Sequence, residues 1–474
     1  MHLYFMGICG TAMGNAALLF RAMGHTVSGS DTGVYPPMSD MLRDAGVTIL
    51  EGWDPARLAA LKPDLVVVGN VVSRGHPEME WLLESSEIPF VSLPELFRTQ
   101  LLNRRNPIVV SGTHGKTTTT CLAAFLLMHN GKNPGYLVGG VPRDLPSGSH
   151  PGPDGAPFVI EGDEYDTAFF DKRSKFIQYL PRTLVINNVE FDHADIFRDL
   201  TDVLKTFTHV TRVVPRNWRI VANGDDANVA TVVAGVKWCP VVRVGEGEAN
   251  DCRIVDFTET PAGSSFRLLW KGREWAKVNW SLPGLFNARN AAMAAVAAGL
   301  ATNPEDPTHL DLACLKDFLG VKRRQEVHID RPDLVVLEDF GHHPTAIALT
   351  LESLRRRYPK HRIAAAFEPR SNTAVRKLLQ DAFRDALAHA DAAFIAPVHR
   401  AEAYKDEDRL DTAVVADELA RRGLYAVAAT SNDHLLKALT DNVAGAKSMP
   451  QLVVFFSNGA FGGIIKKFVD ASKR

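Results

Sequence analysis

Paired cysteines, long apolar runs and an excess of charge of either sign are all missing from this sequence. The cysteines number five, an odd count, and no two of them form a C-x-x-C pair: Cys9, Cys121, Cys239, Cys252 and Cys314. This pattern argues against a disulfide framework and against a cysteine zinc site. We therefore predict reduced thiols, most of them buried.

No apolar run approaches the roughly 20 residues that a membrane-spanning helix needs. Residues 1–7 show no basic region followed by an apolar stretch, so we expect no secretory signal. Lys and Arg number 53 against 55 Asp and Glu, which leaves no global basic field to attract nucleic acid or an anionic membrane. The expected location is the cytoplasm, with neither a membrane nor a nucleic acid as partner.

Ordinary globular composition is what the chain does have, with 46% apolar and 23% charged residues. Its 474 residues suggest about three domains. Short apolar segments alternate with helical ones, which predicts parallel sheets. The expected strands are residues 3–6, 26–30, 47–50, 65–69, 90–92, 108–111, 158–161, 184–187, 219–222, 334–337, 363–367, 393–396 and 452–456.

Several other segments complete this α/β prediction. Residues 16–23 and 290–300 are expected helices, and residues 252–280 alternate as antiparallel strands do. Residues 101–107 read as a linker, and the Pro/Gly-rich loop 142–157 is expected to be exposed and mobile. We place three domains at residues 1–104, 105–322 and 323–474.

A phosphate-binding loop is predicted where an expected strand is followed by glycines and a helix. Its residues are Gly112, Thr113, His114, Gly115, Lys116, Thr117 and Thr118. Backbone N–H groups in such a turn, with a helix N-terminus behind them, form a cradle for phosphate. In this pattern Lys116 reaches the β- and γ-phosphates of ATP, and the Thr117 hydroxyl binds Mg²⁺. The loop is shorter than the usual one, since two residues separate its glycines. The central domain is thus expected to bind ATP.

Acidic segments follow the next two expected strands of the same domain, at residues 161–166 and 187–193. Ligands bind at the carboxyl ends of parallel strands, so these carboxylates and His193 are expected beside the phosphate loop. Oxygen ligands suit Mg²⁺, and a histidine fits a second metal position. Each segment alone is more often a solvated loop, but their joint placement favours a metal site.

Two further pairs of residues are candidates for the nucleotide. Asn287 and Asn290 have amides that can hydrogen-bond an adenine edge, although capping of the following helix is an equally simple interpretation. Arg324 and Asp339 lie at and after the second domain boundary. They can bring the third domain onto phosphate and ribose, or else form a charged hinge and a strand-ending turn.

The N-terminal glycine turn is a weaker signal of the same kind. It comprises Gly7, Gly10, Thr11, Ala12, Met13 and Gly14, with Asp31 after the next strand. It is not a full G-x-G-x-x-G motif. A pyrophosphate cradle and a plain strand–helix turn are both consistent with it.

Polar residues after two strands of the third domain suggest a binding site for a substrate that carries carboxylates. These residues are Arg370, Ser371, Asn372, Thr373 and Asn458. An arginine can hold a carboxylate through two parallel hydrogen bonds, and the others add neutral donors and acceptors. The alternative is that Arg370 and its neighbours only brace a loop.

With these motifs in order, the whole chain resembles the Mur ligase family. The most specific segments are residues 112–118, 163–176, 368–373 and 457–463. The resemblance implies a Rossmann-like UDP-binding domain, a central P-loop ATP-binding domain and a Rossmann-like C-terminal domain that receives an amine. It places uridine diphosphate on the N-terminal glycine turn, Mg²⁺ at Thr117, Glu161 and His193, and catalysis on Lys116, Glu161 and His193.

The resemblance is strongest to the branch of this family that joins UDP-N-acetylmuramate to L-alanyl-γ-D-glutamyl-meso-diaminopimelate. It implies an ATP-dependent ligase that forms an acyl phosphate and serves the recycling of cell-wall peptides. A ligase that adds L-alanine to UDP-N-acetylmuramate is the nearest alternative. A P-loop ATPase that switches a protein partner belongs to another class, and it would turn over ATP without either substrate. A non-catalytic UDP-sugar binder is disfavoured, because it needs no γ-phosphate clamp.

Overall fold

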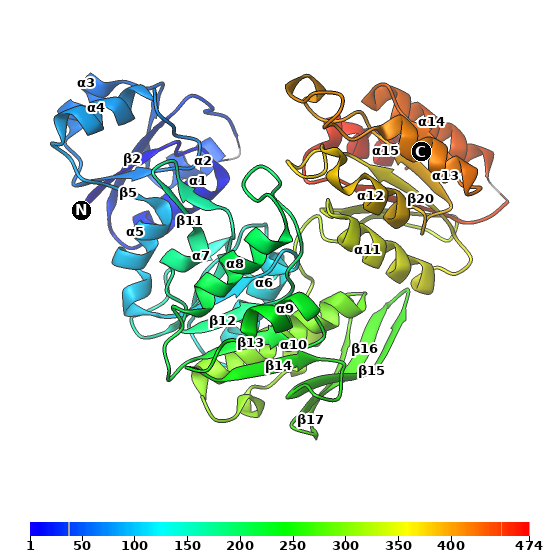
Figure 1. Ribbon diagram of the computed structural model, residues 1–474, viewed down its shortest axis with the longest axis horizontal. Helices are drawn as coiled ribbons and strands as arrows, with labels where there is room; N and C mark the ends of the chain where they lie inside the picture. The colour runs from blue at the N-terminus through cyan, green and yellow to red at the C-terminus, as the bar shows by residue number, and fades with distance from the viewer. Residues whose placement is uncertain (37, 447, 474) are drawn as a thin grey trace.

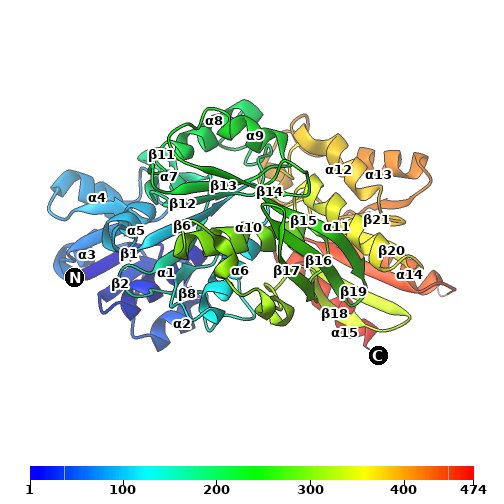
Figure 2. The same cartoon turned by 90° about the horizontal axis from the view of Figure 1, so that it is seen from below.

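The structure is a computed structural model that describes residues 1–36, 38–446 and 448–473. Three α/β units, each with its own main sheet, follow one another along the chain, with the first and third above the central one in the view of Figure 1. In the orthogonal view of Figure 2 the central unit again separates the other two. The predicted three-sheet α/β organisation is confirmed. None of the helices in the described ranges is long and apolar enough to cross a membrane.

The first sheet is parallel, with strand order β3-β2-β1-β4-β5. Its strands are β1 (His2–Met6), β2 (Thr26–Asp31), β3 (Thr48–Glu51), β4 (Leu65–Val68) and β5 (Phe90–Ser92). Its helices are α1 (Thr11–Ala22), α2 (Met38–Asp44), α3 (Pro55–Leu61), α4 (Pro77–Ser85) and α5 (Leu93–Gln100). Buried apolar side chains of β1 and β4 contribute to packing on both faces of the sheet, as is usual for central parallel strands.

The central sheet has the order β17-β16-β15-β14-β13-β12-β6-β9-β7-β8. Its strands are β6 (Asn106–Ser111), β7 (Gly135–Leu137), β8 (Ser149–His150), β9 (Pro157–Gly162), β12 (Thr183–Ile186), β13 (Arg219–Asn223), β14 (Val241–Gly245), β15 (Cys252–Thr260), β16 (Gly263–Trp270) and β17 (Arg273–Trp280). The helices of this unit are α6 (Lys116–His129), α7 (Lys175–Gln178), α8 (Leu200–Thr211), α9 (Ala227–Val233) and α10 (Leu285–Thr302), and a separate hairpin comprises β10 (Asp166–Ala168) and β11 (Asp171–Ser174). The predicted antiparallel meander is confirmed as β15–β17.

The third sheet has the order β18-β19-β23-β20-β21-β22, with only the edge strand β18 antiparallel. Its strands are β18 (Glu326–Asp330), β19 (Leu334–Asp339), β20 (Arg362–Phe367), β21 (Ala392–Ile395), β22 (Tyr425–Ala428) and β23 (Gln451–Phe456). Its helices are α11 (Pro344–Arg357), α12 (Gln380–Leu387), α13 (Thr412–Arg421), α14 (Asn432–Gly445) and α15 (Ile464–Ser472). Apolar clusters lie on each face of this sheet.

Helices α6 and α10 form the centre of the molecule. They pack against each other, and both are buried on nearly all sides. The many alanines of α10 let the two backbones approach closely, and burial on all sides explains why neither helix has a polar face. This packing fixes the start of α6, where the predicted phosphate loop lies.

The structure differs from the sequence-based expectations at three places. Helix α10 begins at Leu285, so Asn287 and Asn290 lie inside the helix and the capping interpretation is wrong. Asn106 and Pro107 belong to β6 rather than to a linker. The loop 142–157 contains β8 and the buried side chain of Leu145, so it is only partly exposed; carbonyls of the loop accept hydrogen bonds from the buried Arg105.

Two minor points concern the cysteines and the domain boundaries. All five cysteines are free, and three of them are buried, as expected. The proposed boundaries at residues 104/105 and 322/323 both fall between sheets, since β6 begins at Asn106 and β18 at Glu326. We keep those boundaries as proposals.

Candidate functional site

The predicted phosphate loop connects β6 to α6 at the carboxyl end of the central sheet. Gly112 and Gly115 have left-handed backbones, with φ of 134° and 78°. A Cβ atom on Gly112 would lie 3.0 Å from Asn187 Cβ, and one on Gly115 would lie 2.5 Å from Asn290 Oδ1. Both positions therefore require glycine for conformation and for space. Thr118 is buried in the first turn of α6.

Lys116 is held inside this loop by neighbouring acceptors. Its Nζ donates to the Gly112 carbonyl at 2.7 Å and to Glu164 Oε2 at 3.0 Å, and Glu164 is only 2% exposed. Burial opposes the charge of Lys116, but Glu164 and Asp163 outweigh it and raise the lysine pKa. A cation therefore lies at the position where the phosphates of a nucleotide are expected.

Two groups of oxygen and nitrogen ligands lie next to Lys116. The Thr117 hydroxyl donates to Glu161 Oε2 at 3.1 Å, while Glu161 Oε1 accepts from Gly139 N at 2.6 Å. His193 Nε2 lies 3.2 Å from Glu164 Oε1, and Asp163 completes this second group. The structure thus brings Thr117 to Glu161 but groups His193 with Glu164, a partner that was not in the predicted metal set.

The electrostatics of these groups suit a divalent cation. Desolvation raises the pKa of Glu161, as expected for a carboxylate that lacks a cationic partner at bonding distance. The Thr117–Glu161 pair offers the hard oxygen donors that Mg²⁺ prefers, and the His193 group offers a mixed set for a second ion. His193 also has a left-handed backbone (φ 55°), a conformation that is concentrated at functional sites in non-glycine residues.

The asparagine candidates differ from each other. Asn287 is buried and donates to the Pro283 carbonyl at 2.7 Å, so its amide nitrogen already has a partner. Asn290 is buried against Gly115, directly behind the phosphate loop. The structure therefore brings Asn290 to the loop, whereas Asn287 lies one turn earlier on α10.

Arg324 and Asp339 bring the third sheet towards the same edge. Asp339 accepts from Gly341 N at 2.6 Å and from Gln325 N at 2.9 Å, and burial raises the pKa of this carboxyl. The Arg324 guanidinium lies over the Phe340 ring, 4.6 Å from its centroid. Its positive charge partly opposes the rise that burial causes in the pKa of Glu161 in the central unit.

The N-terminal glycine turn is built as expected, but only part of it faces solvent. Gly7 is left-handed (φ 79°) and donates to the Ser30 carbonyl at 2.8 Å, while Asp31 accepts from Cys9 N at 2.8 Å. Gly10, Thr11 and Ala12 are exposed at the start of α1, whereas Met13 and Gly14 are buried. Met13 belongs to the apolar core, so its side chain is not available to a ligand.

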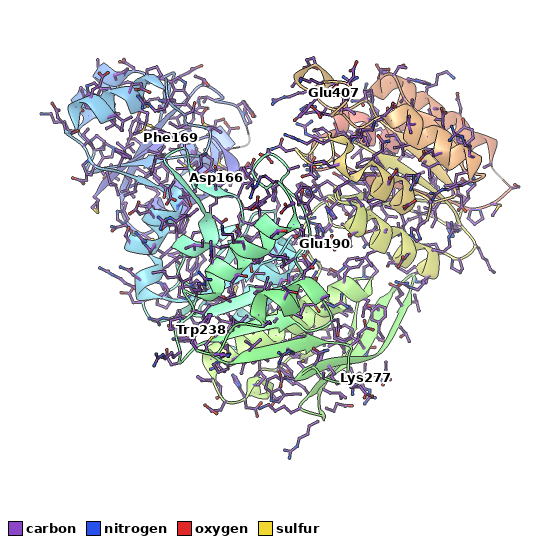
Figure 3. All side chains as sticks on the ribbon, in the orientation of Figure 1. Asp166, Phe169, Glu190, Trp238, Lys277 and Glu407 are labelled. Atoms are coloured by element: carbon purple, nitrogen blue, oxygen red, sulfur yellow. The ribbon has the colours of Figure 1, made fainter. Side chains whose placement is uncertain are left out.

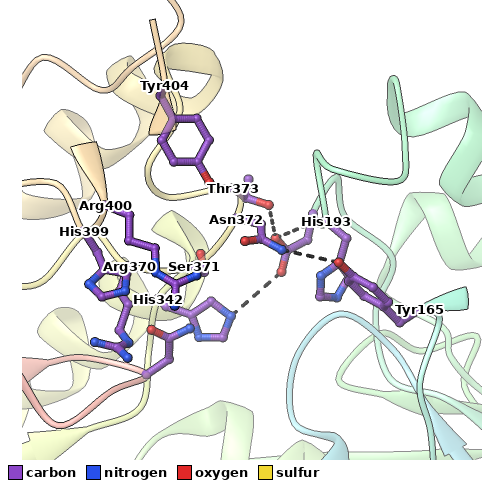
Figure 4. Close-up of a pocket in the computed structure, with 12 residues that line it drawn as sticks. Tyr165, His193, His342, Arg370, Ser371, Asn372, Thr373, His399, Arg400 and Tyr404 are labelled. Carbon is purple, nitrogen blue, oxygen red and sulfur yellow. Dashed lines mark hydrogen bonds and ion pairs between the residues drawn. The ribbon is translucent and has the colours of Figure 1, made fainter. Parts of the chain in front are cut away.

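A cavity of about 420 Å³ opens between the central and third units (Figure 4). It is lined by Tyr165, Asp192, His193, His342, Arg370, Ser371, Asn372, Thr373, His399, Arg400, Tyr404 and Asn458. All five residues expected to bind the amine substrate are among them. The Thr373 hydroxyl donates to Asp192 Oδ1 at 2.6 Å, and Asn372 Nδ2 donates to Asp195 Oδ2 at 2.9 Å. Hydrogen bonds thus join the two units beside the cavity.

Sequence reasoning missed several residues of this cavity. Three of them, Tyr165, Asp192 and His342, lie in or next to segments that were already candidates. Their position after predicted strands is the signal that could have identified them. His399, Arg400 and Tyr404 follow β21 in a segment that carries no motif. Arg400 has a left-handed backbone (φ 51°), and burial lowers the pKa of His342 to about 4. The cavity therefore combines two arginines with three histidines.

Comparisons with known proteins agree with this geometry. The model of the Mur ligase family, catalytic domain, matches residues 2–105, and that of the Mur ligase middle domain matches residues 110–298. The UDP-N-acetylmuramate–L-alanyl-γ-D-glutamyl-meso-2,6-diaminoheptandioate ligase of Escherichia coli (strain K12) is 39% identical over 99% of this chain and 98% of its own length. The crystal structure of a murein peptide ligase from Psychrobacter arcticus 273-4 matches with a TM-score of 0.70 and 35% identity, over 99% of this chain and 98% of that one.

A relative with a different substrate in its name is less similar. The UDP-N-acetylmuramate–L-alanine ligase of Roseiflexus sp. (strain RS-1) is 31% identical over 85% of this chain and 86% of its own length. The fold, the phosphate loop and relatives that match over the full length lead to one conclusion: this chain belongs to the Mur ligase family.

Proposed function

We propose that this protein is an ATP-dependent ligase that joins the carboxylate of UDP-N-acetylmuramate to the amine of L-alanyl-γ-D-glutamyl-meso-diaminopimelate. The observation that carries the proposal is the cavity beside His193, which presents Arg370 and Arg400 to a substrate rich in carboxylates. The full-length similarity to ligases named for this tripeptide supports the same substrate. Because ATP supplies the energy, we place the reaction in the cytoplasm.

The chemistry starts from a carboxylate, which is a poor electrophile at neutral pH. Transfer of the γ-phosphoryl group of ATP to this carboxylate forms an acyl phosphate and releases ADP. The attacking amine then forms the amide bond, and phosphate leaves. Lys116 is placed to stabilise the charge of the transferring phosphoryl group through its ammonium. Water would hydrolyse the acyl phosphate, so the third unit has to cover the site during the reaction.

Mg²⁺ fits the residues at the start of α6. We propose Thr117 and Glu161 as its first ligands and His193 with Glu164 as ligands of a second ion, because these side chains bring oxygen and nitrogen donor atoms together beside the phosphate loop. When bound, Mg²⁺ neutralises phosphate charge and orients the γ-phosphate. We keep Gly112–Thr118, Asn290, Arg324 and Asp339 as the proposed ATP contacts.

We propose that UDP-N-acetylmuramate, the substrate that carries the reacting carboxylate, binds at the first sheet. The exposed backbone of Gly10, Thr11 and Ala12 at the N-terminus of α1 offers N–H groups for a pyrophosphate. Hairpin β10–β11 reaches from the central unit to the first sheet, where Asn70 Nδ2 donates to the Asp166 carbonyl at 2.8 Å. Figure 3 shows Asp166 and Phe169 at this junction, which connects the two substrate regions.

The test is to identify the products by mass spectrometry. Purified protein is incubated with ATP, Mg²⁺ and UDP-N-acetylmuramate, together with either the tripeptide or L-alanine at equal concentration. We expect the tripeptide adduct and ADP. Efficient product from L-alanine alone would instead assign the protein to the alanine-adding ligases, and ATP turnover without either substrate would indicate a switch ATPase.

A further inference from the structure

A third group of metal-type ligands lies outside the positions proposed for Mg²⁺. It consists of His114 in the phosphate loop, Glu190 after β12 and His343 at the N-cap of α11. Glu190 Oε2 lies 3.2 Å from His114 Nε2 and 3.1 Å from His343 Nδ1. Figure 3 shows Glu190 at the junction of the central and third units. The group therefore links the nucleotide loop to the unit that carries the amine pocket.

The hydrogen bonds of His343 indicate which of its nitrogens carries the proton. Its Nε2 lies 3.1 Å from the Phe191 carbonyl, which can only accept, so Nε2 carries the proton and donates. In the neutral ring with its proton on Nε2, Nδ1 carries the lone pair. Apart from the Thr345 N–H at 3.4 Å, the group that faces Nδ1 is Glu190 Oε2.

Glu190 presents a second electron pair at the same point. Its Oε2 faces ring nitrogens of both histidines, at 3.2 Å from His114 Nε2 and 3.1 Å from His343 Nδ1. With His343 in this neutral tautomer, Nδ1 and the Glu190 carboxylate are two acceptors 3.1 Å apart. Two acceptors at this distance repel each other, and a cation that accepts both lone pairs removes the repulsion.

The geometry and the chemistry of the three ligands select the kind of cation. Ligand atoms about 2.0–2.1 Å from a tetrahedral Zn²⁺ lie about 3.3 Å apart, close to the two distances measured here. Two imidazoles and one carboxylate suit Zn²⁺ or Co²⁺ better than Mg²⁺. The hydrogen bond from His343 to the Phe191 carbonyl is of the kind that orients metal-binding histidines.

We propose that His114, Glu190 and His343 bind one transition-metal ion of the Zn²⁺ type, separate from the Mg²⁺ positions. Two ligands come from the central unit and one from the third, so the ion holds the phosphate loop against the N-terminus of α11. The side chains of His114 and Glu190 are 19% and 26% exposed, which leaves one side open to a water molecule or a phosphate oxygen as fourth ligand. The site depends on the two units being in contact.

The test is titration of the full-length protein with Co²⁺, without nucleotide or Mg²⁺, followed by visible absorption. The His193→Ala variant removes the histidine of the other candidate group, so the remaining signal reports this site. We expect one Co²⁺ per chain with the strong bands of four-coordinate, nitrogen-ligated cobalt, and displacement by Zn²⁺. Adding His343→Ala should weaken binding more than about tenfold and abolish these bands, since loss of an outer partner alone commonly costs that much.

Matched variants separate metal binding from packing. His342→Ala in the His193→Ala background changes the neighbouring histidine and should keep the cobalt bands. His343→Ala also deletes an N-cap, so Glu190→Gln serves as a second variant that preserves side-chain shape, with circular dichroism as a folding check. If His193→Ala binds no Co²⁺, or if the bands survive both His343→Ala and Glu190→Gln, His343 is only a cap and a hydrogen-bond donor. No substrate enters this measurement, so its failure would leave the proposed ligase activity untouched.

Discussion

At the residue scale, Lys116 belongs to the phosphate loop and forms a salt bridge with the buried Glu164. Its ammonium lies between the Gly112 carbonyl and Glu164, at the position proposed for the γ-phosphate. We expect Lys116→Ala to lower kcat/KM by about 10²–10³, as removal of one electrostatic stabiliser does. ADP release in the presence of both substrates measures the effect, with Lys132→Ala, an exposed lysine beyond α6, as the matched control.

The salt bridge to Glu164 complicates this variant, because Lys116→Ala leaves a buried carboxylate without its cation. The double variant Lys116→Ala/Glu164→Gln removes that charge and should recover much of any loss in melting temperature while remaining inactive. Activity within a few-fold of wild type in either variant would show that the phosphate loop is assigned wrongly.

A substitution of Arg400 tests the proposed amine-binding cavity, whose residues the sequence motifs predicted only in part. It lines the cavity together with Arg370 and has a strained, left-handed backbone. A hydrogen bond between charged groups is worth about 1.5–3 kcal/mol, so Arg400→Ala should raise the KM for the tripeptide about 10- to 150-fold. Steady-state kinetics with saturating ATP gives the value. Arg421→Ala, at an exposed position of α13, is the control, and an unchanged KM in Arg400→Ala would show that Arg400 does not bind the tripeptide.

At the scale of elements, one buried carboxylate connects three of them. Glu259 in β15 accepts from Gly284 N before α10 at 2.9 Å, from Ser353 Oγ in α11 at 2.9 Å and from Arg356 at 2.5 Å. Its side chain is only 2% exposed. Glu259→Leu leaves these donors unsatisfied and should destabilise the protein by about 1–3 kcal/mol.

The measurement is the melting temperature, compared with that of Glu274→Leu, an exposed acidic residue of β17, which β16 separates from β15 in the same sheet. We expect a clear decrease only for Glu259→Leu. Equal melting temperatures for the two variants would mean that α11 is held to the central unit by other contacts.

At the scale of the whole molecule, the third unit is in contact with the central one. Thr373–Asp192, Asn372–Asp195 and His343–Phe191 are hydrogen bonds across this junction. Polar contacts between units can be broken and remade, and the third unit has to open for substrates to enter. We expect small-angle X-ray scattering to show a smaller radius of gyration when an ATP analogue, Mg²⁺ and UDP-N-acetylmuramate are added.

The variant Asp192→Asn/Thr373→Val weakens the junction and should shift the ligand-free protein towards the more extended profile. Identical profiles for the wild-type protein with and without saturating ligands would argue against closure.

Local sequence was sufficient for features that depend on backbone geometry. Gly112 and Gly115 have positive φ angles in a strand–loop–helix segment, and such turns can be predicted from the positions of their glycines. The three-sheet α/β organisation also follows from the alternation of apolar strands and helices. The start of α10 was predicted too late in the chain. Gly284 precedes the helix without a side-chain cap, and the Ala-rich pattern indicated a helix only from residue 290.

Local residue patterns were therefore enough to predict the fold class, the phosphate loop and the resemblance to the family. The side-chain partners, in contrast, become clear only from the packing of the units: His193 pairs with Glu164, Thr117 pairs with Glu161, and Arg400 joins Arg370 in one cavity. The two differ because local motifs and tertiary contacts act over different distances along the chain. A motif specifies the backbone over a few residues, whereas a site shared by two sheets depends on how buried helices such as α6 and α10 pack and on where that packing brings the strand ends together.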